Sequence, residues 1–335
     1  MIDLIIPAYN AHDTIEETLF SVAMQDKVNK LNVYLVNDCS KKNYQKEVEY
    51  FSQFMNIKEL TLEKNSGPGI ARQHGINNSK SEYIVFLDSD DVFADCFAIS
   101  NLLYAIKMDN HDVGVTNFAM ECANNTFITR KMNSVWLHGK IYKRQFLMDN
   151  KIEFNNTYAN EDNAFNQLVF LSDAKINYFD RNTYIWRFNP NSITRINDHE
   201  YDFKGLEGYV YNLTWAVEEG IKRNFNQNKI AILTFSSLVT IYFYYLQYID
   251  KKEVGNLLIM SKKLRKIQKE YGSFLSLAEK ETIMGNEIQN ILADEKRKHL
   301  VFPQLTFDQF LKKIDTIKLK EYCNWNSKLV RGVKK

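Results

Sequence analysis

Long apolar runs and charge of a single sign are both missing from this sequence of 335 residues. Its 43 lysines and arginines nearly balance 41 aspartates and glutamates, so the net charge is only +2. Without a global basic field the chain lacks the mark of a general nucleic-acid binder, and we expect no nucleic-acid partner. No apolar run approaches the roughly 18 residues of a membrane-spanning helix. The longest, residues 230–248, contains serine, threonine, glutamine and several tyrosines, which indicates a buried helix.

Cysteine is scarce, and Cys39, Cys96, Cys122 and Cys323 have no metal-like spacing. This pattern is typical of reduced thiols in a cytoplasmic protein. The first residue leads directly into an apolar segment, which leaves no room for a signal peptide. We therefore expect a cytoplasmic protein that is either soluble or bound peripherally to the inner face of a membrane.

The first part of the chain alternates short β-rich segments with amphipathic ones. Strands are expected at residues 3–6, 32–36, 57–62, 83–87 and 113–117. Helices are expected between them, at residues 14–24, 44–55, 69–77 and 97–108. Regular β-α alternation predicts a parallel sheet with helices on both faces, and therefore the α/β class.

The rest of the chain is first mixed and then helical. Further strands are expected at residues 127–132, 176–179 and 184–187, with helices at residues 143–150 and 162–172. Apolar residues at three- and four-residue steps predict helices at residues 209–223, 230–249, 254–271 and 307–320. We place the domain boundary after residue 198, which gives an α/β domain over residues 1–198 and a helical domain over residues 199–335.

Polar clusters follow the predicted strands of the first domain. They occur at residues 8–10, at Asp38, at Asn65 and at residues 88–91. Ligands of such sheets bind beyond the carboxyl ends of the strands, so we expect these side chains at one edge. Asp88, Asp90 and Asp91 fall within four residues, where like charges repel unless a cation lies among them. A divalent cation holding a diphosphate is one solution, and a solvated turn with Asp91 capping a helix is the other.

Seven segments occur in a fixed order along the first 195 residues: IIPAYNA, VNDCS, NSGPGIAR, FLDSDD, GKIYKR, NEDNAF and WRFNPNSITR. Together they resemble family 2 glycosyltransferases of the GT-A fold, of the bacterial or phage polysaccharide and teichoic acid type. The resemblance implies a Rossmann-like mixed sheet flanked by helices, followed here by a mostly helical C-terminal domain. It also implies inverting transfer of a sugar from a nucleotide sugar, usually a UDP-sugar, with Mn²⁺ or Mg²⁺.

The resemblance assigns the donor site residue by residue. Asp88 would meet the ribose, Ser89 would also bind the nucleotide sugar, and Asp90 would hold the metal. Asp38 would accept the N3–H of uracil, although a turn aspartate is the alternative. The remaining donor-site residues would be Pro7, Ala8, Tyr9 and Asn10 around the base, Asn65 and Arg72 in the uridine cleft, and Lys140, Arg187 and Ser192 near the phosphates. For Arg72 a surface ion pair is the alternative, and for Arg187 and Ser192 a surface loop.

The pair Glu161–Asp162 would complete the catalytic set. An inverting transfer needs one carboxylate to take the proton of the attacking hydroxyl, and the resemblance assigns this role to Asp162. The alternative is a helix cap with Glu161 exposed to solvent. Trp136 and His138 are candidates to contact the acceptor, since an indole face can stack on a sugar, although large aromatics are more often core residues. Many relatives place a histidine ligand where this chain has Asn189, Asn191 and Ser192.

The helical domain carries basic segments. Residues 261–271 hold five lysines and arginines against one glutamate, and residues 311–335 hold eight against two acidic residues. Either these bind an anionic acceptor or membrane surface, or they are solvated helix faces. The apolar helices could also join copies of the chain into a homo-oligomer.

The sequence therefore predicts a hexosyl or N-acetylhexosaminyl transferase acting on a cell-surface glycan, teichoic acid or glycolipid. A nucleotidyltransferase is a weaker alternative, because the segment after the first strand has no Gly- and Lys-rich phosphate loop. An inactive glycan-binding or scaffold protein on the same fold is the non-enzyme alternative.

Overall fold

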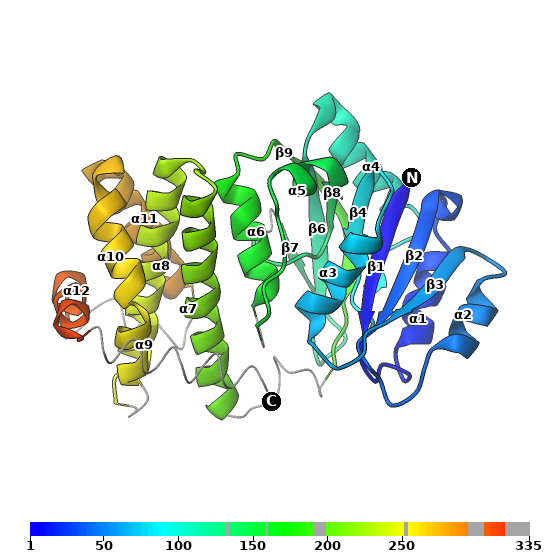
Figure 1. Cartoon of the computed structure of the whole chain (residues 1–335), viewed down its shortest axis with the longest axis horizontal. Coiled ribbons are helices and arrows are strands. Elements are labelled where there is room, and N and C mark those ends of the chain that lie inside the picture. Colours follow the sequence, from blue (N-terminus) through cyan, green and yellow to red (C-terminus); the bar gives the residue numbers. More distant parts are fainter. Residues whose placement is uncertain (132–133, 158–159, 190–198, 251–253, 294–304, 319–335) are drawn as a thin grey trace. The chain divides into compact units, whose positions relative to one another are not determined.

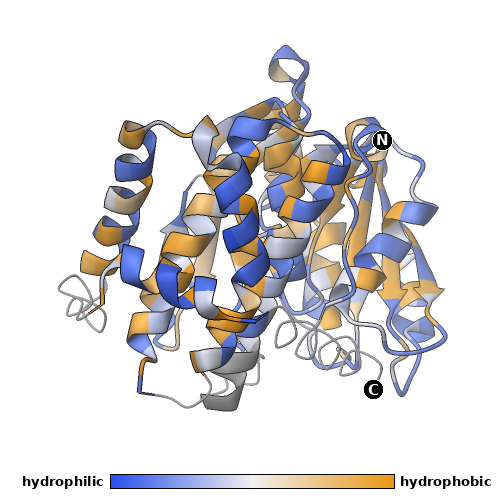
Figure 2. Cartoon of the chain, turned by 60° about the vertical axis from the view of Figure 1, so that its left-hand side comes forward, coloured by the Kyte–Doolittle hydropathy of each residue, from blue (hydrophilic) through white to orange (hydrophobic). Residues whose placement is uncertain are grey.

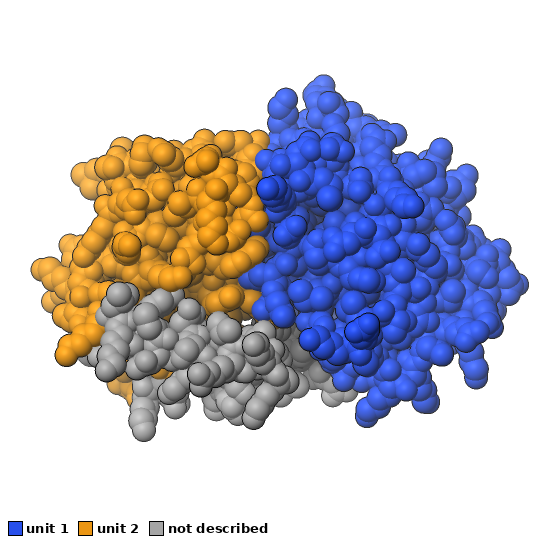
Figure 3. All heavy atoms as spheres, in the orientation of Figure 1, with its two compact units in different colours: residues 1–156, 161–169, 174–197 blue, residues 157–160, 170–173, 198–335 orange. Residues whose placement is uncertain are grey.

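The structure, a computed structural model, describes residues 1–131, 134–157, 160–189, 199–250, 254–293 and 305–318, with the side chains of residues 199–204 left aside. The chain forms two compact units (Figure 3). Unit 1 comprises Met1–Asn156, Glu161–Val169 and Ala174–Asn197. Unit 2 comprises Thr157–Asn160, Phe170–Asp173 and Asp198–Lys335.

Unit 1 is built on a sheet whose nine strands in the described residues follow the order β3-β2-β1-β4-β8-β6-β9-β5, with β7 paired to β6 (Figure 1). The strands are β1 (Ile2–Ala8), β2 (Leu31–Asn37), β3 (Asn56–Thr61), β4 (Tyr83–Phe86), β5 (Val92–Phe93), β6 (Val113–Glu121), β7 (Phe127–Arg130), β8 (Lys140–Lys143) and β9 (Ile176–Trp186). β1 is parallel to β2 and β4, β2 to β3, and β6 to β9, whereas β8 is antiparallel to both β4 and β6. The carboxyl ends of six strands and the start of β8 therefore share one edge.

Helices pack on both faces of this sheet. They are α1 (Ile15–Ala23), α2 (Gln45–Phe51), α3 (Pro68–Asn78), α4 (Ala98–Lys107), α5 (Arg144–Asp149) and the first part of α6 (Glu161–Leu171), with short 3₁₀ turns at Val28–Lys30 and Met108–Asn110. The period of two in β1 decides which face each side chain covers. Ile2, Leu4 and Ile6 join the core shared with α1 and α4, whereas Ile5 lies against Gly75 of α3.

An aromatic core holds the start of α6 against the sheet. Phe86 of β4 packs edge-on against Tyr142 of β8 and Phe154, at centroid distances of 5.8 and 5.5 Å. Phe165 of α6 stacks on Phe154 at 4.3 Å. All four rings are buried, so this core fixes the helix that begins with Glu161 relative to the end of β4.

Unit 2 is helical among the residues that the structure describes. Its helices are α7 (His199–Lys222), α8 (Gln227–Gln247), α9 (Val254–Met260), α10 (Lys262–Tyr271), α11 (Leu277–Leu292) and α12 (Phe307–Thr316), with a 3₁₀ turn at Gly272–Phe274. Phe310 of α12 packs against Tyr242 and Tyr245 of α8. By length and composition alone, α8 is long and apolar enough to cross a membrane. However, 72% of its most apolar stretch of 18 residues is buried within the protein. Such burial is also what a core helix of a folded domain shows, in agreement with the interpretation of residues 230–248.

The basic stretch of α10 is largely occupied by contacts within unit 2. Lys263 pairs with Glu218 at 2.7 Å, and Arg265 and Lys269 both pair with Asp315 of α12, at 2.9 and 2.8 Å. Lys262 donates to the carbonyl oxygens of Ile314 and Asp315 at the end of α12. These contacts favour a role in helix packing over a free anion-binding surface.

Several elements differ from the sequence-based expectation. The strands β5 and β8 were not predicted, and β5 has only two residues, which are too few to show a period. The two strands predicted at residues 176–179 and 184–187 are one strand, Ile176–Trp186, whose pairing with β6 shifts register after Thr116. The predicted helix over residues 254–271 is two helices divided at Ser261, and α11 was not predicted separately. Figure 2 shows helices that alternate orange and blue along their length.

Candidate functional site

The loops that follow β1 and β2 are joined by hydrogen bonds. The backbone N–H of Asn10 donates to Ser40 Oγ at 2.9 Å, and the N–H of Lys41 donates to Asn10 Oδ1 at 3.0 Å. The buried Tyr44 hydroxyl accepts from the N–H of Ala11 at 2.8 Å. Pro7 and Ala8 end β1, and Tyr9 leaves half of its side chain exposed at this edge. The four residues predicted to surround the base thus lie at the end of β1 and at the start of the hydrogen-bonded loop after it.

Asp38 shapes the loop after β3. Its two carboxylate oxygens accept from the N–H groups of Ser66 and Gly67, both at 2.7 Å. Gly67 has φ +87°, a conformation that favours glycine, so the NSGPG segment turns directly over the carboxylate. Burial raises the pKa of Asp38 even though the two N–H groups act to lower it. Asn65 lies in the same loop with an exposed side chain.

Arg72 joins two of the predicted motifs. This buried guanidinium donates through Nη1 to Glu161 Oε1 and through Nη2 to Asp88 Oδ1, at 2.6 Å in each case. Gly69 permits the approach of α3, because an added Cβ would lie 2.9 Å from Glu161 Cγ. Burial acts to lower the pKa of Arg72, but the flanking carboxylates of Asp88 and Glu161 raise it above its usual value. The alternatives of a surface ion pair for Arg72 and an exposed Glu161 are both wrong, since both residues are buried.

The three aspartates after β4 have different partners. Burial acts to raise the pKa of Asp88, but Arg72 and His138 hold it well below its usual range. Asp90 accepts from Asn189 Nδ2 at 3.3 Å, and burial together with the Asp88 charge raises its pKa. Asp91 is buried and accepts from the Tyr184 hydroxyl at 2.6 Å and from the N–H of Arg187 at 2.8 Å. Burial and the charges of Asp90 and Asp88 raise the pKa of Asp91. Asp91 does not cap α4, which Phe97 precedes.

These acidic groups fit a hard divalent cation. Donor atoms of Asp88, Asp91 and His138 lie within 4.8 Å of one another. Among the described residues, Asp90 and Asp91 accept hydrogen bonds but form no ion pair. Carboxylate oxygens are the preferred ligands of Mg²⁺ and Mn²⁺, and an imidazole is compatible with Mn²⁺. The assignment of the metal to Asp90 stays a prediction, as Asp90 is outside this cluster of three.

His138 is a buried residue of the same region. Its ring stacks on Tyr184 at 4.4 Å, and Nε2 lies 3.7 Å from Asp88 Oδ2. Burial lowers the pKa of His138 despite the neighbouring carboxylate. The ring therefore supports the acidic centre, whereas Trp136, two residues earlier, keeps 36% of its surface exposed.

Asp162 occupies the first turn of α6. Its carboxylate accepts from the N–H of Asn163 at 2.7 Å. Burial and the adjacent Glu161 charge raise the pKa of Asp162 to about 7, which suits a general base near neutral pH. Lys140, at the start of β8, donates to the carbonyl oxygen of Trp136 at 2.5 Å, and burial lowers the pKa of this lysine to about 7.

Arg187, which was predicted to lie near the phosphates, forms ion pairs with two glutamates. Arg187 pairs with Glu121 of β6 at 2.9 Å and also with Glu17 of α1. Ser192 lies outside the described residues, as does Asn191. The carbonyl oxygen of Ser89 accepts from the Thr14 hydroxyl at 2.9 Å, which joins the start of α1 to the D-S-D segment.

Three residues of the site were missed by sequence reasoning. Tyr44 braces the first loop, Tyr184 bonds to Asp91, and Asn166 donates from α6 to the carbonyl oxygen of Val135. In the sequence, Tyr44 and Tyr184 have the character of ordinary core aromatics. Their part in the site is seen only from the hydrogen bonds of their hydroxyl groups to residues far away in the chain. Asn166 stands four residues after Asp162, a helical spacing that could have indicated it.

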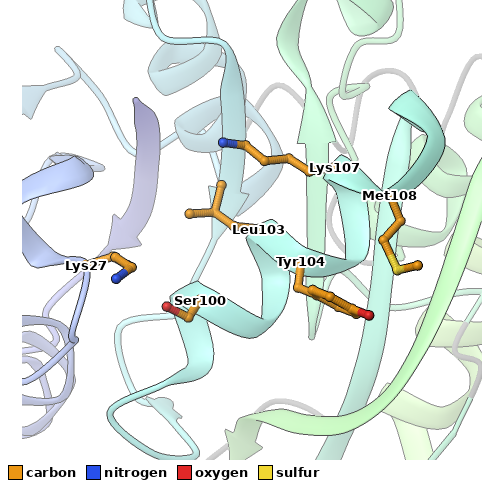
Figure 4. Close-up of a pocket in the computed structure, with 6 residues that line it drawn as sticks. All are labelled: Lys27, Ser100, Leu103, Tyr104, Lys107 and Met108. Carbon is orange, nitrogen blue, oxygen red and sulfur yellow. The ribbon is translucent and has the colours of Figure 1, made fainter.

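One surface hollow lies apart from these residues. It has a volume of about 400 Å³ and is lined by Ser100, Leu103, Tyr104 and Lys107 of α4, by Met108 of the following 3₁₀ turn, and by Lys27 (Figure 4). None of the predicted site residues that the structure describes lines it.

The geometry agrees with what comparison with known proteins finds. The model of the family described as glycosyl transferase family 2 matches residues 3–161. Residues 3–161 of this chain form a glycosyl transferase family 2 domain. The resemblance to this family is thereby confirmed, and five of the seven segments lie within the matched residues.

Curated relatives share the same part of the chain. The poly(ribitol-phosphate) beta-N-acetylglucosaminyltransferase TarS of Staphylococcus aureus is 28% identical over 198 residues, covering 55% of this chain and 35% of TarS. Glycosyltransferase GlyA of Streptococcus pneumoniae is 26% identical over 224 residues, covering 58% of this chain and 32% of GlyA. The chain thus spans about a third of the length of these relatives.

Solved structures extend the likeness in fold. The crystal structure of S. aureus TarS residues 1–349 with UDP superimposes with a TM-score of 0.64 at 18% identity, over 94% of this chain and 90% of that one. The mannosyltransferase PcManGT of Pyrobaculum calidifontis, solved with GDP-Man and Mn²⁺, gives a TM-score of 0.53 at 14% identity, over 94% and 85%. The predicted GT-A fold of the family 2 domain, with helices following it, is confirmed.

Proposed function

We propose that this chain transfers a sugar from a UDP-sugar to a hydroxyl of a bacterial surface polymer, with inversion at the anomeric carbon. The observation that carries the proposal is the buried Arg72 bridge, which joins Asp88 of the D-S-D segment to Glu161, the residue before Asp162. Donor-site and base-site carboxylates thereby belong to one rigid network at the carboxyl edge of the sheet. The relatives agree, because TarS was solved with UDP and with UDP-GlcNAc and is named for a poly(ribitol-phosphate) acceptor.

In the proposed reaction Asp162 takes the proton of the acceptor hydroxyl. The hydroxyl oxygen forms a bond to the anomeric carbon as the bond from that carbon to the diphosphate oxygen breaks, and the electron pair leaves with UDP. The proposed roles of Asp38 and Asn65 are to hold the uridine. Held by the Asp88, Asp90 and Asp91 segment, a Mn²⁺ or Mg²⁺ ion would supply charge stabilisation for the diphosphate.

The structure around Asp162 suits a base that must be positioned before reaction. The aromatic core under α6 fixes the helix, and Asn166 joins this helix to the carbonyl oxygen of Val135 at 2.7 Å. A base held at a fixed place removes a proton without first losing side-chain freedom. The proposed setting is the cytoplasm, with free thiols at Cys39, Cys96 and Cys122. Peripheral membrane contact and homo-oligomer formation stay predictions.

The test is sugar transfer by Asp162→Asn against UDP binding by the same variant. We expect transfer to fall by a factor of about 10² or more, because the amide cannot take the proton, while UDP affinity changes little. Asp149→Asn, an exposed aspartate of α5, is the matched control and should keep wild-type transfer. Near-normal transfer by Asp162→Asn would refute the base assignment, and failure of the wild-type chain to bind or hydrolyse any nucleotide sugar would favour an inactive scaffold.

A further inference from the structure

Trp136 and Trp186 form a partly exposed aromatic pair in unit 1. Their ring centroids are 6.3 Å apart with 44° between the planes. Trp136 rests edge-on against the buried ring of Phe118, at 5.6 Å. An indole ring packed against a core ring while 36% of the residue is exposed offers an apolar surface on a rigid support.

One side of this pair lies next to the acidic centre. Trp186, the last residue of β9, contacts the ring of His138 at 5.6 Å. Nε2 of His138 in turn lies 3.7 Å from Asp88 Oδ2. The aromatic pair is therefore one side chain away from the carboxylate predicted to meet the donor ribose.

The other side of the pair is joined to the helix of the proposed base. Asn166 Nδ2 donates to the carbonyl oxygen of Val135 at 2.7 Å and to that of Asp162 at 3.1 Å. Lys140 Nζ donates to the carbonyl oxygen of Trp136 itself at 2.5 Å. The backbone around Trp136 is thus tied by hydrogen bonds to Lys140 and to the helix that carries the proposed base.

We propose that Trp136, supported by Trp186, is the platform on which an uncharged sugar ring of the acceptor stacks while its hydroxyl faces Asp162. This inference rests on the proposed function. The face of an indole carries negative quadrupole density, which attracts the partly positive C–H groups on one side of a sugar ring. A rigid ring also loses little conformational freedom on stacking, whereas a linear polyol must be ordered along its whole length.

The charges at the site favour the same acceptor class. Among the described residues, the buried cations named here already have partners: Arg72 is shared by two carboxylates, and Lys140 Nζ donates to the carbonyl oxygen of Trp136. The proposed metal ion serves the donor diphosphate, so a phosphate on the reacting acceptor unit would lack a counterion beside Asp162. We therefore expect the reacting unit to be an uncharged ring, in contrast with the phosphate-bearing polyol named for TarS.

Saturation-transfer difference NMR of the full chain with UDP and Mg²⁺ tests this. The probes are methyl glycosides of glucose, galactose and N-acetylglucosamine, with ribitol 5-phosphate as the charged polyol. We expect at least one glycoside to receive saturation at its ring C–H protons and ribitol 5-phosphate to receive several-fold less. Trp136→Leu, which keeps an apolar side chain, should lower the glycoside signal by about tenfold, and Trp136→Phe should restore part of it.

The controls separate this inference from the proposed function. Phe97→Ala, which removes an aromatic residue that is 57% exposed elsewhere in unit 1, should leave the glycoside signal unchanged. An equal signal for ribitol 5-phosphate, or an undiminished glycoside signal in Trp136→Leu, would overturn the platform while UDP binding by the wild-type chain upheld the proposed function. A wild-type chain that binds neither UDP nor any glycoside would overturn both.

Discussion

Arg72 and Glu161 form a buried ion pair, with 2.6 Å between Nη1 and Oε1. The second amino group of the same guanidinium reaches Asp88, so one cation serves two carboxylates that come from separate loops. Removing one partner of a buried pair leaves charge without compensation in a medium that solvates it poorly. The positions of Asp88 and of the helix that carries Asp162 therefore depend on Arg72.

Arg72→Met should destabilise the protein strongly. The change leaves two buried carboxylates without their cation, and we expect a loss of about 3–5 kcal/mol in the free energy of unfolding. Urea unfolding followed by circular dichroism measures it, because the midpoint falls while the slope stays constant.

Two further variants test the cause of that loss. Lys222→Met removes the cation of an exposed pair with Glu219 and should cost less than about 1 kcal/mol. In the double variant Arg72→Met/Glu161→Gln one of the two orphaned charges is gone, so part of the stability should return. If the double variant is no more stable than Arg72→Met, the ion pair is not the source of the loss.

The rate of sugar transfer should depend on pH through Asp162. Burial and the Glu161 charge raise the pKa of this carboxyl to about 7, and a base must be ionised to accept a proton. We expect kcat/KM to fall about tenfold per pH unit below pH 7 and to level off above it. Glu161→Gln removes a neighbouring negative charge, so the pKa of Asp162 falls and the acid limb moves to lower pH.

The matched control for this profile is Glu153→Gln, which changes an exposed glutamate of the same unit and should leave the limb in place. A limb that stays near pH 7 in Glu161→Gln, or moves to higher pH, would show that another group sets the profile.

The shared edge of the site could be predicted from the sequence, whereas its side-chain partners could not. Asp38, Asn65 and Asp88 follow strands of a β-α alternation, and the topology alone brings the ends of such strands together. The pair Arg72–Glu161 joins residues 89 positions apart, and the Tyr184–Asp91 bond joins residues 93 apart. No local period encodes a contact of that separation, because it arises from tertiary packing.

The same limit explains the assignments that changed. Glu161 begins a helix, where the sequence alone suits an exposed cap. The aromatic core beneath α6 and the missing Cβ of Gly69 instead allow Glu161 to contact Arg72. The cations of α10 form a basic run in the sequence, yet Asp315 of α12 pairs with two of them. Charged residues along the chain therefore indicate which segments are basic or acidic, but not which residues pair with one another.

Asp38 offers a test of uracil recognition. Its oxygens already accept two backbone N–H groups, and each has a second lone pair for the N3–H of uracil. Asp38→Asn replaces one oxygen by a donor, so we expect UDP affinity to fall about tenfold and CDP affinity to fall less, since cytosine presents an acceptor at N3. Isothermal titration with both nucleotides measures the ratio. Equal losses for UDP and CDP would show that Asp38 only holds the loop at Ser66 and Gly67.

Replacing Asp90 by asparagine should raise the melting temperature above that of the wild-type chain without metal, and lower it below the wild type with metal. Burial and the Asp88 charge raise the pKa of Asp90, so without a cation its ionised form is less stable in the folded chain than in water. In EDTA, Asp90→Asn should therefore melt about 2–4 °C above the wild-type chain, for a gain of about 1 kcal/mol. With Mn²⁺ or Mg²⁺ and UDP the order should reverse, because the wild-type chain gains more from binding the ion. Asp13→Asn, at an exposed aspartate, should follow the wild type in both conditions. An Asp90→Asn chain that gains as much from the ion as the wild type would move the metal to the cluster of Asp88, Asp91 and His138.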